Sequence, residues 1–130
     1  MVSFKQTALN SAHDTGKEGE RIARTYLESQ GYVIEEQNWR KGRAEIDIIA
    51  REGDILVFVE VKTRSSEDYG RPELFISPRQ AELLAAGAAA YMESIDYDWE
   101  LRFDVISIIL NPNGSYELNH LKDTYFPGME

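Results

Sequence analysis

The sequence predicts a single α/β domain in which helices flank a central mixed sheet, in the order α-β-β-β-α-β with an additional edge strand. The chain has 130 residues, a length that suits one domain with a sizeable core. Two apolar, β-branched runs, residues 44–50 and 55–62, are separated by a turn signal and predict a hairpin. A helical pattern then leads to a further apolar run at 101–110. A right-handed crossover of this kind makes the two flanking strands parallel or nearly so.

The first expected element is a helix near the N-terminus. Asp14-Thr15-Gly16-Lys17 provides helix-start chemistry and Gly31 provides the stop. The apolar residues between these signals have the spacing of a helix that packs on a core: Ile22, Ala23, Tyr26 and Leu27. We therefore expect a flexible arm at residues 1–13 and a first strand from Tyr32 to Trp39.

The hairpin determines which side chains share a face of the sheet. A two-residue turn at Glu52-Gly53 would place Asp47 opposite Phe58 and Glu45 opposite Glu60. Both faces of the second run are apolar until Glu60, which predicts a central strand covered on both sides.

The second half of the chain continues with a polar segment, Thr63–Ile76, which is long enough to be functional rather than connective. Ser77 then starts a helix as its N-cap, followed by Pro78 and by Gln80 at the capping-box position. The remaining expected segments are this helix to about Ser94, strands Leu101–Leu110 and Ser115–Leu121, and a tail at 123–130. The folded domain is thus expected to span residues 14–122.

Composition narrows the classes of function. The chain has no cysteine, which excludes disulfides and cysteine-based zinc sites. Residues 1–6 lack the apolar core of a secretory signal, and the apolar run Leu83–Met92 is too short to span a bilayer, so we expect a cytoplasmic protein. A net charge of −9 argues against indiscriminate nucleic-acid binding, although more than half of the basic residues lie between positions 40 and 79.

Three acids and a lysine converge in the expected hairpin. Alternation along the strands would put Glu45, Asp47, Glu60 and Lys62 on one face, provided that the register is right. At an effective dielectric of ~20, two carboxylates ~5 Å apart repel by roughly 3 kcal/mol, a cost that a bound divalent cation would offset. The alternative is a set of ordinary strand-end charges. Buried carboxylates followed by a lysine favour metal-dependent cleavage of a phosphodiester.

Several segments together resemble the small bacterial YraN family, which is assigned to the PD-(D/E)xK nuclease-like superfamily that also contains archaeal Holliday-junction resolvases. The resemblance covers Gly16 to about Leu110. Its segments are Gly16–Glu20, Asn38–Arg40, Glu45–Ala50, Phe58–Arg64 and Arg102–Val105. The sequence departs from the family pattern at Ala44, where a glycine is usual, and at Arg79, where a lysine is usual. The fold implied by the resemblance is a restriction-endonuclease-like core.

The resemblance implies that Asp47 and Glu60 bind the metal and that Lys62 is the catalytic lysine. Glu20 would be a further acid from the first helix, and the alternative is a first-turn acid favoured by the helix dipole. Oxygen ligands without thiols point to Mg²⁺ or Mn²⁺, with the Val61 carbonyl as an additional ligand. Lys62 would orient the attacking water or neutralise charge on the phosphorus.

Other residues have weaker assignments. Glu45 is a less favoured metal ligand than the acids above. The residues expected to touch the DNA backbone are Arg40, Lys41, Thr63 and Arg64. Trp39 is expected to pack in the core rather than stack on a base, and Asp104 to pair with Arg102, although its motif leaves a site role open. His13 and His120 lack metal-ligand spacing and are expected at the surface.

Two functions from different classes follow. The first is a Mg²⁺-dependent DNA endonuclease that hydrolyses phosphodiester bonds, including those of branched DNA. The second is a non-catalytic, nuclease-like module that binds DNA or a protein partner, with a homodimer among the possible assemblies. The presence of Asp47, Glu60 and Lys62 together favours the enzyme, whereas the acidic net charge favours the module.

Overall fold

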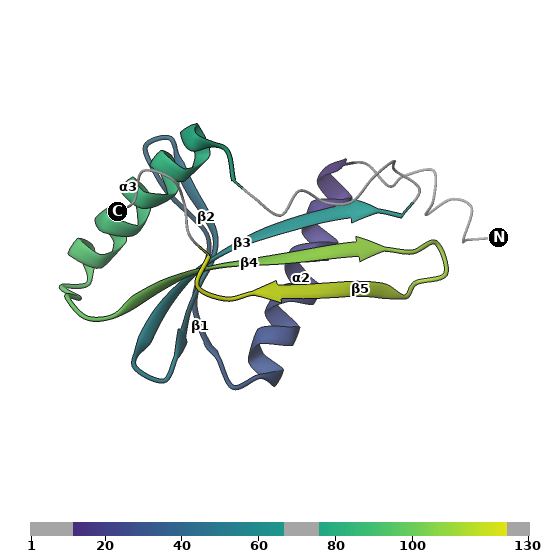
Figure 1. Cartoon of the computed structure of the whole chain (residues 1–130), viewed down its shortest axis with the longest axis horizontal. Helices are drawn as coiled ribbons and strands as arrows, with labels where there is room; N and C mark the ends of the chain where they lie inside the picture. The colour runs from purple at the N-terminus through teal and green to yellow at the C-terminus, as the bar shows by residue number, and fades with distance from the viewer. Residues whose placement is uncertain (1–11, 67–75, 125–130) are drawn as a thin grey trace.

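The computed structural model describes residues 12–66 and 76–124, which form one α/β domain with a helix on each face of a mixed sheet (Figure 1). The helices and strands are α2 (Ala12–Ser29), β1 (Val33–Lys41), β2 (Ala44–Glu52), β3 (Ile55–Ser65), α3 (Pro78–Ser94), β4 (Leu101–Leu110) and β5 (Tyr116–Leu121). The expected fold class is confirmed, and the order is the restriction-endonuclease-like one with β5 added. Within the described residues, no helix is both long enough and apolar enough to cross a membrane.

The five strands lie side by side in their sequence order, β1-β2-β3-β4-β5. Neighbouring strands are antiparallel except for β3 and β4, which are parallel and are joined by the connection that contains α3. This confirms the crossover that the strand–helix–strand order predicts. As a result, β3 has a paired strand on each side from Leu56 to Val59, and beyond Val59 it pairs with β4 alone.

The core consists of two layers, one on each side of the sheet. Strand β3 contributes to both, because Leu56 and Phe58 pack towards α3 whereas Val57 and Val59 pack towards α2. All four side chains are at most 2% exposed. The prediction of a central strand covered on both faces is therefore confirmed.

The predicted register of the hairpin is wrong by two residues. Glu52 lies opposite Ile55 and Ile48 opposite Val59, so the turn consists of Gly53 and Asp54. The physical reason is that a two-residue hairpin turn requires positive φ at its first central position, and Gly53, with φ of 61°, meets this requirement. A shift of two residues does not by itself change the face on which a side chain lies.

Element boundaries also differ in places from those expected. Helix α2 begins at Ala12, inside the expected N-terminal arm, of which residues 1–11 lie outside the described part. Strand β3 runs to Ser65, because it continues to pair with β4 as far as Leu110, so the expected loop begins later than Thr63. Residues 67–75 and 125–130, which make up most of that loop and of the expected tail, lie outside the described part. Helix α3 begins as predicted, since the Ser77 hydroxyl accepts the Gln80 backbone N–H at 3.2 Å.

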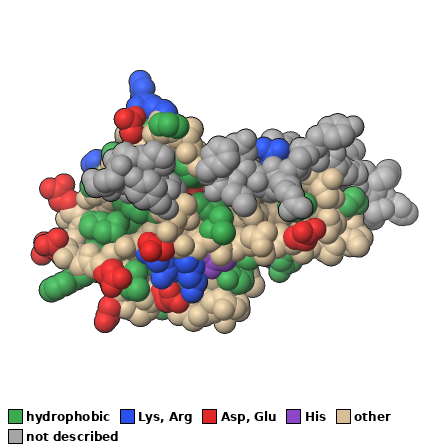
Figure 2. All heavy atoms as spheres, viewed as in Figure 1, with side chains coloured by type: hydrophobic (Ala, Val, Ile, Leu, Met, Phe, Trp, Pro, Cys, Tyr) green, Lys and Arg blue, Asp and Glu red, His purple; other side chains and the backbone are tan. Residues whose placement is uncertain are grey.

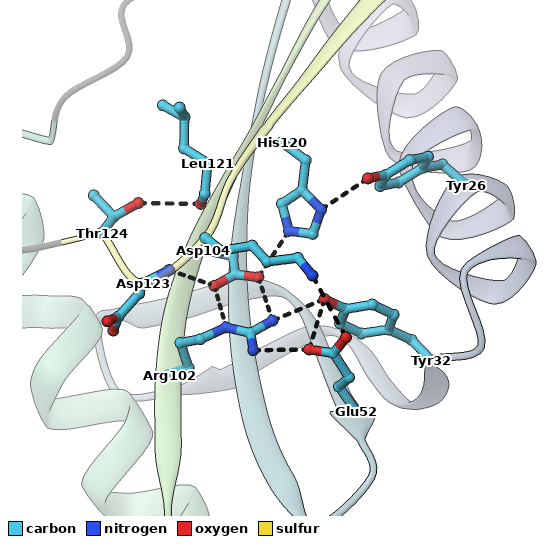
Figure 3. A network of polar contacts seen from close by, with 10 residues as sticks. Tyr26, Tyr32, Glu52, Arg102, Asp104, His120, Leu121, Asp123 and Thr124 are labelled. Carbon is cyan, nitrogen blue, oxygen red and sulfur yellow. Dashed lines mark hydrogen bonds and ion pairs between the residues drawn. The ribbon is translucent and has the colours of Figure 1, made fainter.

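A buried polar network ties α2 to β4 and β5 (Figure 3). Asp104 is completely buried and accepts two hydrogen bonds from the Arg102 guanidinium, at 2.8 and 2.9 Å, so the expected pair is confirmed. His120 places Nε2 2.7 Å from the same carboxylate and Nδ1 3.0 Å from the Tyr26 hydroxyl. The side chain of His120 is only 5% exposed, which contradicts its expected surface position. Its partners lie on other elements, so neighbouring residues in the sequence gave no sign of them.

The network also determines the charge state of Asp104. Burial by itself raises the pKa of this carboxyl, but hydrogen bonds from His120, Arg102 and the Asp123 backbone N–H outweigh burial and hold the pKa at about 2. The carboxylate therefore stays charged and stabilises the fold at neutral pH.

Replacing Asp104 with alanine is expected to lower the free energy of unfolding by about 3–5 kcal/mol, because Arg102 and His120 lose their buried counter-charge. Urea unfolding at pH 7 measures the loss, with Glu117→Ala on the exposed side of β5 as the control. The wild-type advantage should shrink as pH falls from about 4 towards 2, since a lowered pKa gives stability above its ordinary value that acid removes. A loss no larger than that of the control would contradict this account.

Candidate metal and nuclease site

The candidate site lies where β2 and β3 part. The two strands pair from the turn as far as Ile48 and Val59, and beyond this point β3 continues alongside β4. Asp47 is the first residue of β2 past the last pair, and its Oδ2 accepts the Val61 backbone N–H at 2.8 Å. A side-chain carboxylate thus takes the place that a backbone carbonyl of β2 would occupy in a continued ladder.

The alternation of faces along β2 breaks at Asp47. Ile46 belongs to the core layer beneath α3 and Ile48 to the layer beneath α2, although residues two apart in a regular strand share a face. In the facing part of β1, Asn38 has φ of 51°, a left-handed conformation that asparagine tolerates better than most residues. The irregularity turns Asp47 along the sheet, towards the gap, rather than onto either face.

The expectation that the acids and Lys62 share one face is therefore only partly right. Glu60 follows Phe58 in the alternation of β3 and lies on the α3 side, where its Oε2 accepts a hydrogen bond from Gln80 Nε2 at 2.7 Å. Lys62 has the same parity. Asp47 reaches Glu60 from the gap instead of from the same face. A one-residue change of alternation inside β2 cannot be read from a run of isoleucines, because either face accepts them.

Burial and mutual repulsion determine the protonation of the two acids. The pKa of Asp47 is raised to about 8, first by burial and then by the negative charges of Glu60 and Glu20, against the opposing effect of the Val61 N–H. Burial also raises the pKa of Glu60, while Lys62 and the Gln80 hydrogen bond act to lower it. The two carboxyl groups lie close enough for each to act on the pKa of the other, and with a pKa of about 8 Asp47 is mostly protonated at neutral pH.

Gln80 is a site residue that sequence reasoning missed. The sequence assigns it to the capping box, in which its amide would reach back to the Ser77 backbone. In the structure the amide points to Glu60, whereas Ser77 alone caps the helix. The sequence did offer one sign that Gln80 could reach the site. The first turn of α3 follows the segment that leaves the carboxyl end of β3, where Glu60 and Lys62 lie. Arg79, next to it, is exposed and pairs with Glu82.

The remaining candidates differ in how close they come to this centre. Glu20 is half-buried on α2, and its charge acts on Asp47. Glu45 pairs with Arg40 across the strands at 3.2 Å and lies at the exposed rim. The Thr63 hydroxyl is buried without a hydrogen-bond partner, so it does not reach the surface where DNA would lie. Trp39 packs edge-on against Tyr91 at the core, as expected.

The donor set suits a hard divalent cation that keeps water ligands. In residues 12–66 and 76–124, no three acidic or histidine side chains already form a ready-made metal cluster. Mg²⁺, however, commonly binds through one or two carboxylates together with waters and substrate phosphates. Asp47 and Glu60 supply two, and the raised pKa of Asp47 shows that positive charge is favourable at this place.

Replacing Asp47 with asparagine is expected to stabilise the protein in alkali. A carboxyl with a raised pKa stabilises the fold fully below its ordinary value of 3.8 and loses that contribution as pH rises through about 8. An asparagine side chain at this position would keep an acceptor for the Val61 N–H without this loss. The variant should therefore exceed wild type at pH 9 by more than about 1 kcal/mol, the equivalent of one pKa unit.

The measurement is urea unfolding at pH 6 and pH 9 without divalent ions. Asp54→Asn, which changes an exposed carboxylate of the hairpin turn, is the control. Equal pH dependence in wild type and the Asp47 variant would show that this carboxyl is already ionised at neutral pH.

Comparisons with known proteins agree on the family of this chain. The model of a family described as "Uncharacterised protein family UPF0102" matches residues 19–108. A UPF0102 protein of Flavobacterium psychrophilum is 42% identical over 114 residues, covering 88% of this chain and 95% of the relative. A UPF0102 protein of Syntrophus aciditrophicus is 44% identical over 112 residues, covering 85% and 87%. One of Bacteroides thetaiotaomicron is 40% identical over 115 residues, covering 88% and 94%. The chain therefore belongs to the UPF0102 family, the YraN family of the resemblance noted above.

Proposed function

We propose that this protein is a divalent-cation-dependent DNA endonuclease of the PD-(D/E)xK type, which hydrolyses phosphodiester bonds, including those of branched DNA. The observation that carries the proposal is the meeting of Asp47 and Glu60 where β2 and β3 part, with Asp47 bound to the Val61 N–H and Lys62 one residue further on. A purely structural sheet gains nothing from two half-buried carboxyl groups that repel one another.

Asp47 and Glu60 would hold Mg²⁺ or Mn²⁺. The Val61 carbonyl would be a third donor, because the N–H and C=O of one residue in an extended strand point to the same side and the N–H already faces Asp47. When bound, such a cation polarises the scissile phosphate and lowers the pKa of a bound water. Gln80 holds Glu60 in place by donating to one oxygen and leaves the other oxygen available.

Lys62 brings positive charge to the reacting phosphate. It is half-buried, and its ammonium is close enough to Glu60 to lower the pKa of that carboxyl. A group in this position would orient the attacking water or neutralise charge that develops on the phosphorus. Neither role requires a proton to leave the lysine.

The charge distribution is compatible with DNA despite the net charge of −9. Figure 2 shows that acidic groups gather towards the α3 end of the visible face. The end of α3 and the segment after it carry exposed acids, namely Glu93, Asp96, Asp98 and Glu100. Lys41 is exposed at the end of β1, and Arg64 follows Lys62 by two residues in β3. Arg40 is already paired with Glu45, so it would contribute less to phosphate binding than the sequence suggested.

The alternative is a non-catalytic module that binds DNA or a protein partner, and the acidic net charge favours it. The two functions differ in one measurable respect. A module without catalysis would leave every DNA substrate intact in the presence of metal, whether or not it binds DNA.

The test combines metal binding with cleavage. Millimolar Mn²⁺ or Mg²⁺ should raise the melting temperature of wild type, because a ligand that binds only the folded state stabilises it, and Glu60→Gln should abolish the increase. Labelled linear, nicked, flapped and four-way-junction DNA should be cut by wild type with metal, and Asp47→Asn should be inactive. Metal stabilisation without cleavage of any substrate would favour the module. If neither ion raises the melting temperature of wild type, the proposed metal site is disproved.

Replacing Lys62 with alanine should separate binding from chemistry. We expect the variant to fold and to keep the metal-dependent rise in melting temperature, while its cleavage rate falls by at least about 100-fold, as for removal of one electrostatic stabiliser of a transition state. Arg79→Ala, which changes an exposed residue of α3, is the control. Cleavage at the wild-type rate by purified Lys62→Ala would disprove the proposed role.

A further inference from the structure

Helix α2 approaches β3 most closely at Gly19. A β-carbon added at this glycine would lie 1.8 Å from Thr63 Oγ1 and 2.7 Å from both Thr63 Cβ and Cγ2. Atoms cannot approach so closely, and most of the obstruction belongs to a β-branched side chain that has little freedom to turn away. Gly16, one turn earlier in the same helix, has nothing within 4 Å of the equivalent position. The need for glycine is therefore specific to the point of contact with Thr63.

The surroundings of Thr63 in β3 also show that this contact is tight. Its hydroxyl is buried and has no hydrogen-bond partner, an arrangement that is unfavourable for the fold. The residue follows Lys62 in β3 and faces α2, on the side of the sheet opposite Glu60. The contact is thus made on the same short stretch of strand that carries the proposed site.

Glu20 directly follows Gly19 in the helix. Successive residues of an α-helix are about 100° apart, so the glycine can face Thr63 while the glutamate points to the side. Glu20 is half-buried and is near enough for its charge to raise the pKa of Asp47. The depth of α2 on the sheet therefore controls the distance of this third acid from Asp47.

We propose that Gly19 is a positioning residue of the divalent-cation site. Its contact with Thr63 lets α2 lie deep on the sheet, and this depth brings the carboxylate of Glu20 close enough to Asp47 for its charge to favour the bound cation. The inference rests on the proposed function, since it concerns the same metal site. Gly19 would thus contribute to the site although it has no side chain that could touch the cation.

The first test compares Gly19→Ala with Gly16→Ala. Both changes remove a glycine from α2 and give the same gain in helix propensity, but only the first meets Thr63. The measured quantity is the dissociation constant for Mn²⁺, from the rise in melting temperature above that of the metal-free variant. We expect Gly19→Ala to weaken Mn²⁺ binding by about tenfold or more, as for other changes to residues that surround the ligands of a metal site. Gly16→Ala should bind as wild type does.

Exchanging the side chains at positions 19 and 63 shows whether the contact between them is responsible for the change in Mn²⁺ affinity. Gly19→Ala combined with Thr63→Gly moves the obstruction from strand to helix and should restore the wild-type affinity, whatever the metal-free melting temperature. If Gly19→Ala alone does not fold, the double variant decides the question. Wild-type affinity for Mn²⁺ in the double variant supports the inference, and a double variant that does not fold or that binds Mn²⁺ weakly overturns it.

A double-mutant cycle shows whether Gly19 acts through Glu20. Glu20→Gln should weaken Mn²⁺ binding, and adding Gly19→Ala should weaken it no further. Additive losses, or a single Gly19→Ala that binds Mn²⁺ as wild type does, would overturn the inference and leave the proposed function intact. If wild type itself gains no stability from Mn²⁺, the metal site fails and the inference fails with it.

Discussion

Two half-buried carboxyl groups, Asp47 and Glu60, meet where β2 parts from β3, and removing two such charges from water together is unfavourable. The surrounding structure holds them in place from three directions. The Val61 N–H fixes Asp47, the first turn of α3 fixes Glu60 through Gln80, and the two-layer core keeps β3 rigid beneath them. The free energy that holds this site together therefore comes from packing elsewhere, chiefly from the apolar side chains on both faces of β3.

The position of α2 follows from contacts at its two ends. Near its start, Gly19 lies against Thr63 beside the proposed site. Near its end, the Tyr26 hydroxyl meets His120, and Tyr32, just after the helix, hydrogen-bonds to Arg102 and Glu52. These contacts reach β2, β4 and β5, so the helix is fixed to both halves of the sheet (Figure 3). A helix held in this way can present a side chain such as Glu20 at a defined depth.

The parts of the fold that the sequence predicted are those that depend on local chemistry. Ser77 and Pro78 determine where α3 begins, and apolar runs determine the strands, so these elements agree closely with the structure. The hairpin register was wrong by two residues because the backbone requirement of Gly53 outweighed the choice of turn that the pattern suggested. Such a shift leaves Glu60 and Lys62 on one face, whereas the break in alternation turns Asp47 into the gap, from which it still reaches Glu60.

The parts that were not predicted depend on contacts between distant segments. His120 is buried by Asp104, 16 residues away, and by Tyr26, 94 residues away, and no local pattern distinguishes it from a surface histidine. The irregularity at Asp47 requires β1 and β2 to deviate together, and Gln80 reaches Glu60 only once α3 has packed on the sheet. Local patterns therefore identified the reactive side chains but not the residues that hold them.

Proton and cation compete for the same place in the proposed site. With a pKa of about 8, Asp47 holds a proton at neutral pH, which relieves the repulsion from Glu60 in the metal-free protein. A divalent cation must displace that proton, so its binding becomes tighter as pH rises towards 8. The exchange replaces one positive charge with two and changes the sign of the local field only when metal is present. An acidic protein can in this way repel DNA phosphate without metal and accept it once the cation is bound.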